Sequence, residues 1–389
     1  MPARSGKYRG RFREVLFLLL AGVAALLPAC GGSEPSGPAR SYAMGFTYTP
    51  YDNTSEAIAF ALDVIANDGD LLVAHHDSGI PWDAALANDF AQYPPDFQDE
   101  VVQIAAWKPP GHRLYLAVTP IAFLRDRLAP TRGPGGTQIF QPPWDGYPFD
   151  HPDVVVAFTN HCRMMIDRYR PDYFAFGVEV NLLRAIVPDD NVWNAYVSLS
   201  AQVYAALKAA YPALPIFQTI QAGAFHADTA AQTAAIAQIL PYTDYIAVSA
   251  YPYGESSRYP DGSEADPAIL PADYFSALAD LAPGKPFAIA ETAWPAEDVT
   301  APYPITIRSN PDYQKRYVEF LLAQTGALSG RFVNYFISRD YDPLFAKIPD
   351  SDPNKPLVRL WRDTGLYAED GTARPSLSAW RSVLSRPLR

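Results

Sequence analysis

The sequence is short of the residues on which several kinds of site depend. Its 389 residues include only two cysteines, Cys30 and Cys162, and six histidines. Two cysteines form one disulfide at most, so the fold cannot depend on a disulfide framework. The histidines show no HExxH spacing and no GxSxG segment occurs, which argues against a zincin-type metal site and a serine nucleophile elbow. We therefore expect neither a metal nor another cofactor.

Positive charge is scarce as well. The chain has 31 Lys and Arg residues against 42 Asp and Glu residues, a formal net charge of −11. The segment before Cys30 holds five basic and one acidic residue, so the remainder is more acidic still, about −15. Such a protein is a poor partner for polyanions, and we expect no nucleic-acid binding. A hydrophobic fraction of 49% predicts a large folded core instead.

The N-terminus has the features of an export signal. A basic segment precedes the apolar run VLFLLLAGVAALL, which is shorter than the run that a membrane-spanning helix usually needs. The following Leu27-Pro28-Ala29-Cys30 resembles a bacterial lipobox, which implies removal of residues 1–29 and a lipid on Cys30. Residues 30–41 then form a flexible tether. An ordinary secretory signal or an uncleaved anchor is the alternative.

These features predict a location. Gly31, rather than an acidic residue, follows Cys30, which by resemblance to other lipoproteins favours an outer membrane. We expect the protein to be exported and lipid-anchored at the cell envelope, with the lipid as its only membrane contact. Cys162 is then the single free cysteine, and its apolar neighbours predict that it is buried.

The rest of the chain alternates short apolar runs with longer helical patterns. The runs are apolar on both faces, as in parallel strands covered by helices. The expected strands are residues 42–48, 71–75, 114–119, 173–179, 216–221, 245–251, 287–291 and 333–337, and the clearest helices are 189–210, 229–240, 312–323 and 376–384. Eight strands separated by helices predict an α/β fold, a (β/α)8 TIM barrel, as a single domain over residues 42–389. The irregular stretch 129–150 is either one wall of a groove or a covering insertion.

Two glutamates end the fourth and seventh expected strands, at Glu179 and Glu291. By strand alternation Ala175 and Gly177 share a face with Glu179, and we expect this face to line the barrel interior. The carboxyl ends of the strands meet on one rim of a barrel, where active sites lie. Hydrolysis of a glycosidic bond needs such a pair of carboxyl groups, one to protonate the leaving oxygen and one to attack or to activate water.

Three segments together resemble a known group of enzymes. The strand-four GVE, the strand-six VSAYP and the strand-seven ETAWP are similar to those of the clan of retaining (β/α)8 glycoside hydrolases, with the endo-β-1,4-galactanases most alike. The segment WRDTGLY, residues 361–367, resembles the ending of such enzymes. The resemblance covers most of the chain after residue 42 but rests on short motifs. It implies that Glu179 is the acid/base, that Glu291 is the nucleophile, and that Tyr251 orients Glu291 by a hydrogen bond.

The chain departs from this group at two points. Val178 stands where these enzymes usually have the asparagine that contacts the sugar, and Asn181, on the predicted face of Glu179, is the candidate substitute. The usual tryptophan at the end of strand eight is absent, with Tyr335-Phe336 in that region.

Other residues near the strand ends are candidates for binding sugar. They comprise polar side chains that suit hydroxyl groups and tryptophans that suit a sugar face, namely His75, Asp77, Gln221, Trp82 and Trp294. For each of them a structural role in the core or on the surface is the alternative interpretation.

Together these features predict a monomeric retaining glycoside hydrolase that cleaves a β-linked poly- or oligosaccharide at the cell envelope. Two alternatives remain open. One is a non-catalytic glycan-binding barrel lipoprotein, which the loss of asparagine at Val178 would allow. The other is a transglycosidase that remodels envelope sugars.

Overall fold

A computed structural model describes residues 38–301, 305–352 and 354–389 of the chain. The predicted signal peptide and Cys30 lie outside these residues, as does most of the predicted tether. Arg40, within the predicted tether, is part of the folded domain instead: its side chain is buried and its backbone N–H donates to Pro387 O at 2.9 Å. Within the described ranges, no helix combines the length and apolar character that crossing a membrane requires.

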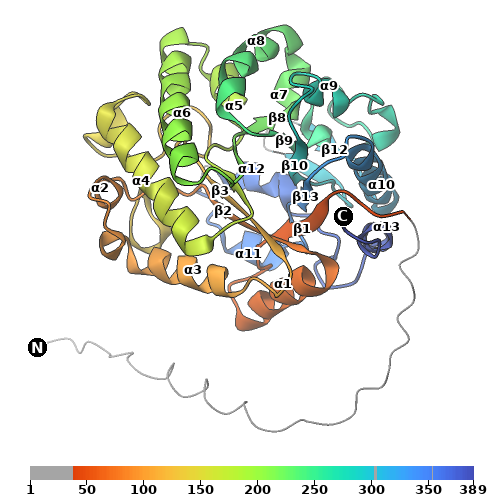
Figure 1. The fold of residues 1–389 in the computed structure, drawn as a ribbon. Coiled ribbons are helices and arrows are strands. Elements are labelled where there is room, and N and C mark those ends of the chain that lie inside the picture. The colour runs from red at the N-terminus through yellow and green to blue at the C-terminus, as the bar shows by residue number, and fades with distance from the viewer. Residues whose placement is uncertain (1–37, 302–304, 353) are drawn as a thin grey trace, which may run out of the picture. The chain divides into compact units, whose positions relative to one another are not determined.

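A parallel sheet forms the centre of the domain (Figure 1). Its strands are β1 (Ala43–Thr47), β2 (Leu71–His76), β3 (Arg113–Val118), β6 (Tyr173–Ala175), β7 (Ile216–Phe217), β8 (Thr219–Gln221), β9 (Ile246–Ala250), β10 (Phe287–Thr292) and β13 (Phe332–Tyr335). They are ordered β7-β6-β3-β2-β1-β13-β10-β9-β8. Only Gln218 separates β7 from β8, so these two short strands share one position and the two ends of the order meet. The predicted (β/α)8 barrel is confirmed, with its fifth strand in two pieces.

Helices surround the sheet on the outside (Figure 1). The longer ones are α1 (Ser55–Asp68), α3 (Pro95–Ala106), α4 (Pro152–Tyr169), α6 (Asp190–Ala210), α8 (Thr229–Ile239), α10 (Pro311–Ala327) and α13 (Pro375–Leu384). Shorter ones are α2 (Trp82–Leu86), α5 (Asn181–Ile186), α7 (Ala222–Ala227), α9 (Ser276–Ala279), α11 (Asp342–Lys347) and α12 (Lys355–Val358). Side-chain caps fix several starts: Asp189 accepts from the N–H of Asn191 at α6, and Asn310 accepts from two N–H groups at α10.

Two sets of buried side chains stabilise the barrel. The larger set fills the space between strands and helices, and it includes Cys162 of α4, which is fully buried as predicted. The smaller set receives side chains from every strand position and fills the barrel interior. It is partly aromatic: the rings of Tyr115 and Phe332 lie 4.9 Å apart and those of Phe217 and Tyr245 lie 5.3 Å apart. The interior is therefore a packed core below the rim, as in other barrels of this type.

The irregular stretch after β3 packs against α2. It contains a hairpin of β4 (Thr131–Arg132) and β5 (Gln138–Ile139), followed by Trp144, which stacks on Trp82 at 5.3 Å. The Trp82 indole is fully buried and its Nε1–H donates to Ala129 O at 2.9 Å. Trp82 thus anchors this insertion and, contrary to expectation, offers no face to a sugar.

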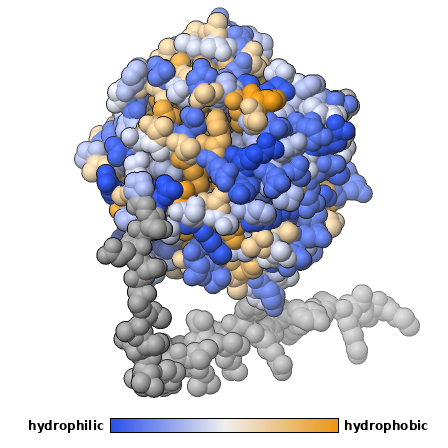
Figure 2. All heavy atoms as spheres, turned by 90° about the vertical axis from the view of Figure 1, so that its right-hand side faces the viewer, coloured by the Kyte–Doolittle hydropathy of each residue, from blue (hydrophilic) through white to orange (hydrophobic). Residues whose placement is uncertain are grey.

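A second hairpin, β11 (Val299–Ala301) with β12 (Ile305–Ile307), follows β10. The face of the molecule that carries α10 and α13 is mostly hydrophilic, with small apolar patches (Figure 2).

Candidate active site

A tight turn after β6 carries Glu179. The strand ends at Ala175, four residues before the predicted end, and Glu179 has a left-handed backbone with φ of 51°. The N–H of Glu179 donates to Thr219 Oγ1 at 2.7 Å, and the N–H of Thr219 donates to Gly177 O at 2.9 Å. Left-handed backbone costs a non-glycine residue roughly 1–2 kcal/mol, so the bonds to β8 must hold this turn in place.

The turn also breaks the strand alternation that the sequence predicted. Val178 belongs to the interior set, whereas Gly177 faces the helices: a Cβ there would lie 2.7 Å from Tyr196 Oη. The predicted shared face of Ala175, Gly177 and Glu179 is therefore wrong beyond Ala175. Glu179 reaches the rim because of the turn, and not because of its parity along a strand.

Asn181, two residues after Glu179, connects the end of this turn to β8 and α8. Its side chain is fully buried; Nδ2–H donates to Gln221 O at 3.0 Å and to Gln232 Oε1 at 2.7 Å, and Oδ1 accepts from the N–H of Gln221 at 2.7 Å. Gln221 in turn caps α7, accepting from Ala224 N–H at 2.6 Å. Contrary to expectation, the Asn181 amide makes its hydrogen bonds to other residues of the protein and is not presented to substrate.

Glu291 lies at an irregularity in β10. Ala288 and Ala290 point into the barrel, so alternation would direct Glu291 toward the helices, but the register against β9 shifts between Ile289 and Glu291. Such a bulge re-aims the side chain. Glu291 Oε2 accepts from the Tyr251 hydroxyl at 2.9 Å, and Oε1 lies 3.5 Å from His75 Nδ1. The hydrogen bond that the resemblance implied for Tyr251 is present.

Arg125 is a site residue that the sequence did not reveal. It lies in the loop after β3, is 6% exposed and has φ of 59°. Its Nη2–H donates to Glu179 Oε2 at 3.3 Å and its Nη1–H to Ala122 O at 3.4 Å. No pattern of strand or helix marks this loop position, so a lone arginine there gives no signal in the sequence.

Burial and neighbouring charges set the titration of the two carboxyl groups. Burial raises the pKa of Glu179 to about 7; Arg125 opposes the shift and the charge of Glu291 adds to it. Burial likewise raises the pKa of Glu291 to about 7, opposed by Arg125 and by the hydrogen bond from Tyr251. Asp77 raises both values. The two glutamates, Arg125 and Asp77 therefore form one electrostatic site, which holds a proton near neutral pH.

His75 adds an uncharged group beside Glu291. Burial lowers the pKa of His75 to about 4, so the imidazole is neutral at pH 7. Its Nε2 is buried and has no hydrogen-bond partner within the part of the chain that is described. Because this nitrogen is buried, the sugar contact predicted for His75 stays a prediction.

An aromatic wall stands next to Glu291. Tyr251, Phe336 and Trp361 make mutual ring contacts at 5.6 to 6.1 Å, and Phe336 also lies 6.1 Å from His75. Trp361 is half-buried and comes from the segment after β13, far in sequence from Tyr251. By contrast Trp294 is fully buried and stacks on Tyr317 at 4.5 Å, so it belongs to the core, contrary to expectation.

No family model and no curated protein matches the sequence. Solved structures do. A GH5_18 protein from Streptomyces cattleya in complex with GlcNAc aligns with a TM-score of 0.62 at 17% identity, over 90% of this chain and 83% of its own. The exo-β-1,4-mannosidase Op5Man5 from Opitutaceae bacterium strain TAV5 aligns with 0.62 at 14% identity, over 93% and 62%. The GH53 catalytic domain of Ignisphaera aggregans aligns with 0.53 at 17% identity, over 90% and 98%.

The chain shares its fold with glycoside hydrolases. At these identities the likeness establishes the fold, and the site must be judged on its own residues.

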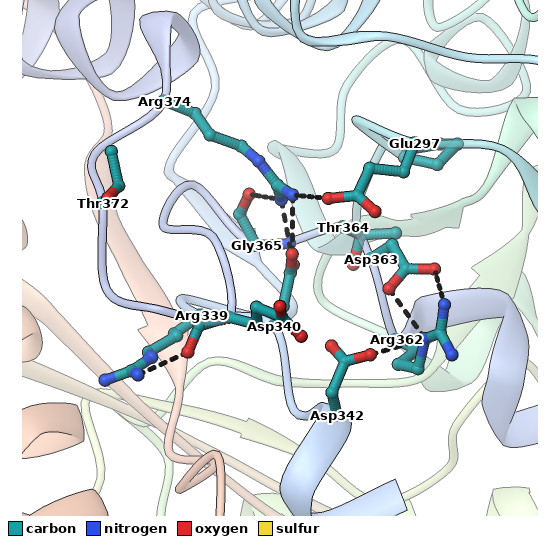
Figure 3. A network of polar contacts seen from close by, with 12 residues as sticks. Glu297, Arg339, Asp340, Asp342, Arg362, Asp363, Thr364, Gly365, Thr372 and Arg374 are labelled. Carbon is teal, nitrogen blue, oxygen red and sulfur yellow. Dashed lines mark hydrogen bonds and ion pairs between the residues drawn. The ribbon is translucent and has the colours of Figure 1, made fainter.

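A charged network fixes the segment that presents Trp361 (Figure 3). Arg374 pairs with Asp340 at 2.6 Å and with Glu297 at 2.7 Å, and Arg362 donates to Asp363 at 2.7 Å. Asp340, Asp363 and Asp342 are the one group within the described residues whose ligand atoms lie close enough together to hold an ion. Because the two arginines already pair with these carboxylates, the network needs no cation to explain it.

Proposed function

We propose that the protein is a retaining glycoside hydrolase that cleaves β-linked poly- or oligosaccharides. One observation carries the proposal: Glu179 and Glu291, from the fourth and seventh barrel positions, both have largely buried side chains, and the charge of Glu291 raises the pKa of Glu179. A structural glutamate pair in the interior would be expected to have a counter-ion for each member. Here one arginine serves two carboxyl groups, which favours a shared proton.

The environment of each carboxyl group suits a different role. Tyr251 donates to Glu291 Oε2 and so stabilises its charged form, which a nucleophile needs. The negative charge on Glu291 raises the pKa of Glu179, which keeps a proton available for the leaving oxygen. Glu291 attacks the anomeric carbon while the bond to the leaving oxygen breaks and Glu179 protonates that oxygen, which leaves the sugar bonded to Glu291. Ionised Glu179 then takes a proton from the water that attacks the same carbon and releases the sugar from Glu291.

Asp77 and the aromatic wall complete the proposed sugar site. The half-buried carboxylate of Asp77 offers hydrogen bonds to hydroxyl groups, and half-buried Trp361 offers an aromatic face. Asparagine is absent at Val178, whose side chain points into the barrel core, so other groups must contact the hydroxyl beside the reacting carbon.

Two similar structures suggest which linkages to test first. One is an exo-β-1,4-mannosidase, and a variant of the GH5_18 protein was solved in complex with Manb1-4GlcNAc. The sequence resemblance adds β-1,4-galactans. The test is release of reducing sugar from β-linked mannans, galactans, glucans and xylans by the protein and by its Glu179→Ala and Glu291→Ala variants, with exposed Glu319→Ala as the control.

We expect activity on one class of glycan that falls by about 10³-fold or more in both site variants and is unchanged in Glu319→Ala. Glycan binding without turnover, equal in the protein and both site variants, would establish the binding alternative instead. Redistribution of chain lengths without new reducing ends would establish transglycosylation.

The proposal includes an envelope location through lipid on Cys30, and it rests on the sequence before residue 42. Fractionation of cells that express the full chain tests this part independently of activity. We expect the protein in the membrane fraction and its Cys30→Ser variant in the soluble fraction. Equal recovery of both proteins in the membrane fraction would contradict a lipid anchor on Cys30. We also propose that the protein is a monomer. Light scattering of the protein without its anchor, in buffer without detergent, checks this.

A further inference from the structure

A cavity of about 330 Å³ opens on the rim between the loop after β3 and the start of α6. Its lining includes aromatic, carboxylate and amide side chains: Asp126, Phe140, Asp145, Tyr147 and Asn191. Loops after strands and the first turns of the following helices lie at the same end of a (β/α)8 barrel. The cavity is therefore on the same face of the barrel as Glu179 and Glu291.

The chain connects this cavity directly to the acid/base position. Asp126 follows Arg125, whose guanidinium donates to Glu179 Oε2 at 3.3 Å. Leu124, on the other side of Arg125, is 52% exposed, and Ile186, at the end of the helix after Glu179, is 49% exposed. Large exposed apolar side chains thus occur on both segments that carry the Arg125–Glu179 pair.

The lining suits one face of a pyranose ring. Phe140 is 48% exposed, and the Arg127 guanidinium lies 5.4 Å from its ring centre. Tyr147 is half-buried and stacks on His151 at 3.6 Å, which holds its ring in place. A sugar stacks its C–H groups on an aromatic face and donates its hydroxyl hydrogens to nearby acceptors.

The charges of the lining exclude one class of sugar. Asp126 and Asp145 contribute two carboxylates, whereas Arg127, the cation in the lining, already pairs with Asp126 at 2.8 Å. A uronic acid would meet net negative charge here, and an uncharged sugar would not.

We propose that this cavity is a subsite for an uncharged sugar on the leaving-group side of the scissile bond. The inference rests on the proposed function, because the group that Glu179 protonates must leave on the side of Glu179. It deepens that function: the substrate is a neutral chain with at least one further sugar beyond the bond that breaks. An enzyme with this subsite favours oligosaccharides over substrates whose leaving group is small.

The test compares two substrates of the same sugar: the β-1,4-linked pentasaccharide of mannose, galactose or glucose, and the matching β-glycosyl fluoride, whose leaving group cannot reach the subsite. The variants are Phe140→Ala and Asn191→Ala, with Phe140→Tyr as the conservative change and exposed Val102→Ala on α3 as the control. Both lining residues are exposed, so the variants should fold, and thermal unfolding checks this.

We expect Phe140→Ala to lower kcat/KM about tenfold on the pentasaccharide, while turnover of the fluoride changes less than twofold and Phe140→Tyr restores pentasaccharide cleavage. Equal loss on both substrates, or no loss on the pentasaccharide, would overturn the subsite while leaving the hydrolase in place. A protein that cleaves neither substrate in any of the three sugar series, and no xylan in the glycan panel, would remove the proposed function and this inference with it.

Discussion

Arg125 and Glu179 contact each other at 3.3 Å, and both have left-handed backbones, with φ of 59° and 51°. They come from different loops of the barrel and both are largely buried. Non-glycine residues in this region are uncommon, and such strain is concentrated at functional sites. Local bonds hold each one: Arg125 N–H donates to Ala122 O at 2.8 Å, and Glu179 N–H donates to Thr219 Oγ1. The fold therefore holds both residues of this pair in uncommon backbone conformations at the rim.

Replacing Arg125 by methionine should shift the pH profile of kcat/KM upward. Arg125 lowers the pKa of both Glu179 and Glu291, so loss of its charge disfavours both ionised forms. The pH profile of such an acid and base pair is bell-shaped, and we expect both its acidic and its basic limb to move to higher pH. Arg125→Lys keeps the charge and should stay close to the original profile. If kcat/KM of the methionine variant fell equally at all pH values and the profile did not move along the pH axis, Arg125 would have a purely structural role.

The variant Glu291→Gln should be more stable than the unchanged protein at pH 8. Folding raises the pKa of Glu291 to about 7, so the folded state holds the proton more tightly and loses stability as pH rises from about 4.5 through 7. Glutamine removes the buried charge while it can still accept from Tyr251. The expected gain is on the order of 1–3 kcal/mol at pH 8 and nearly nothing at pH 4.

Urea unfolding at both pH values measures this difference, with Glu319→Gln on the surface of α10 as the matched control. A Glu291→Gln variant that is equally or less stable at pH 8 would show that the carboxylate is well solvated or fully compensated.

Asn181→Ala should destabilise the fold by roughly 2–3 kcal/mol, because it leaves the buried Gln221 N–H and Gln232 amide without their partner. It should also lower kcat, since the turn that carries Glu179 loses its support. Exposed Asn194→Ala should change stability by less than about 0.5 kcal/mol. If Asn181→Ala raised KM alone at unchanged stability, Asn181 would be a substrate contact after all, and the buried arrangement would be contradicted.

Trp361→Ala should lower kcat/KM by about tenfold or more, because the wall beside Glu291 loses its largest aromatic face. Trp361→Phe should recover most of this loss. The network of Arg374 and Arg362 holds the segment through other residues, so melting temperature should fall little in either variant. Unchanged kinetics in Trp361→Ala would place the sugar away from this wall.

The sequence was sufficient to predict the barrel and to locate Glu179 and Glu291 at its fourth and seventh strand positions; their catalytic roles stay predictions. Both results follow from local pattern: apolar runs alternate with helical segments, and each glutamate closes such a run. Tyr251 could be assigned to Glu291 only through resemblance, and the hydrogen bond at 2.9 Å agrees with it.

Other features depend on tertiary packing that no local pattern encodes. The turn at Glu179 and the bulge before Glu291 both violate strand alternation, so side-chain direction could not be counted along the chain. Trp82 and Trp294 are of the residue type that stacks on sugars, but Trp144 and Tyr317 from distant segments cover them. Arg125 and Trp361 reach the site from long loops, where sequence position says little about spatial position.

The most direct test of the catalytic pair is to trap the covalent intermediate. A 2-deoxy-2-fluoro β-glycoside of the sugar released in the glycan panel, bearing a good leaving group, should inactivate the protein. Mass spectrometry of the intact chain should then show one added glycosyl group, and peptide mapping should place it on Glu291. A label on any other residue would contradict the assignment of the nucleophile. Turnover of the natural glycan with no label at any time would contradict the retaining mechanism itself.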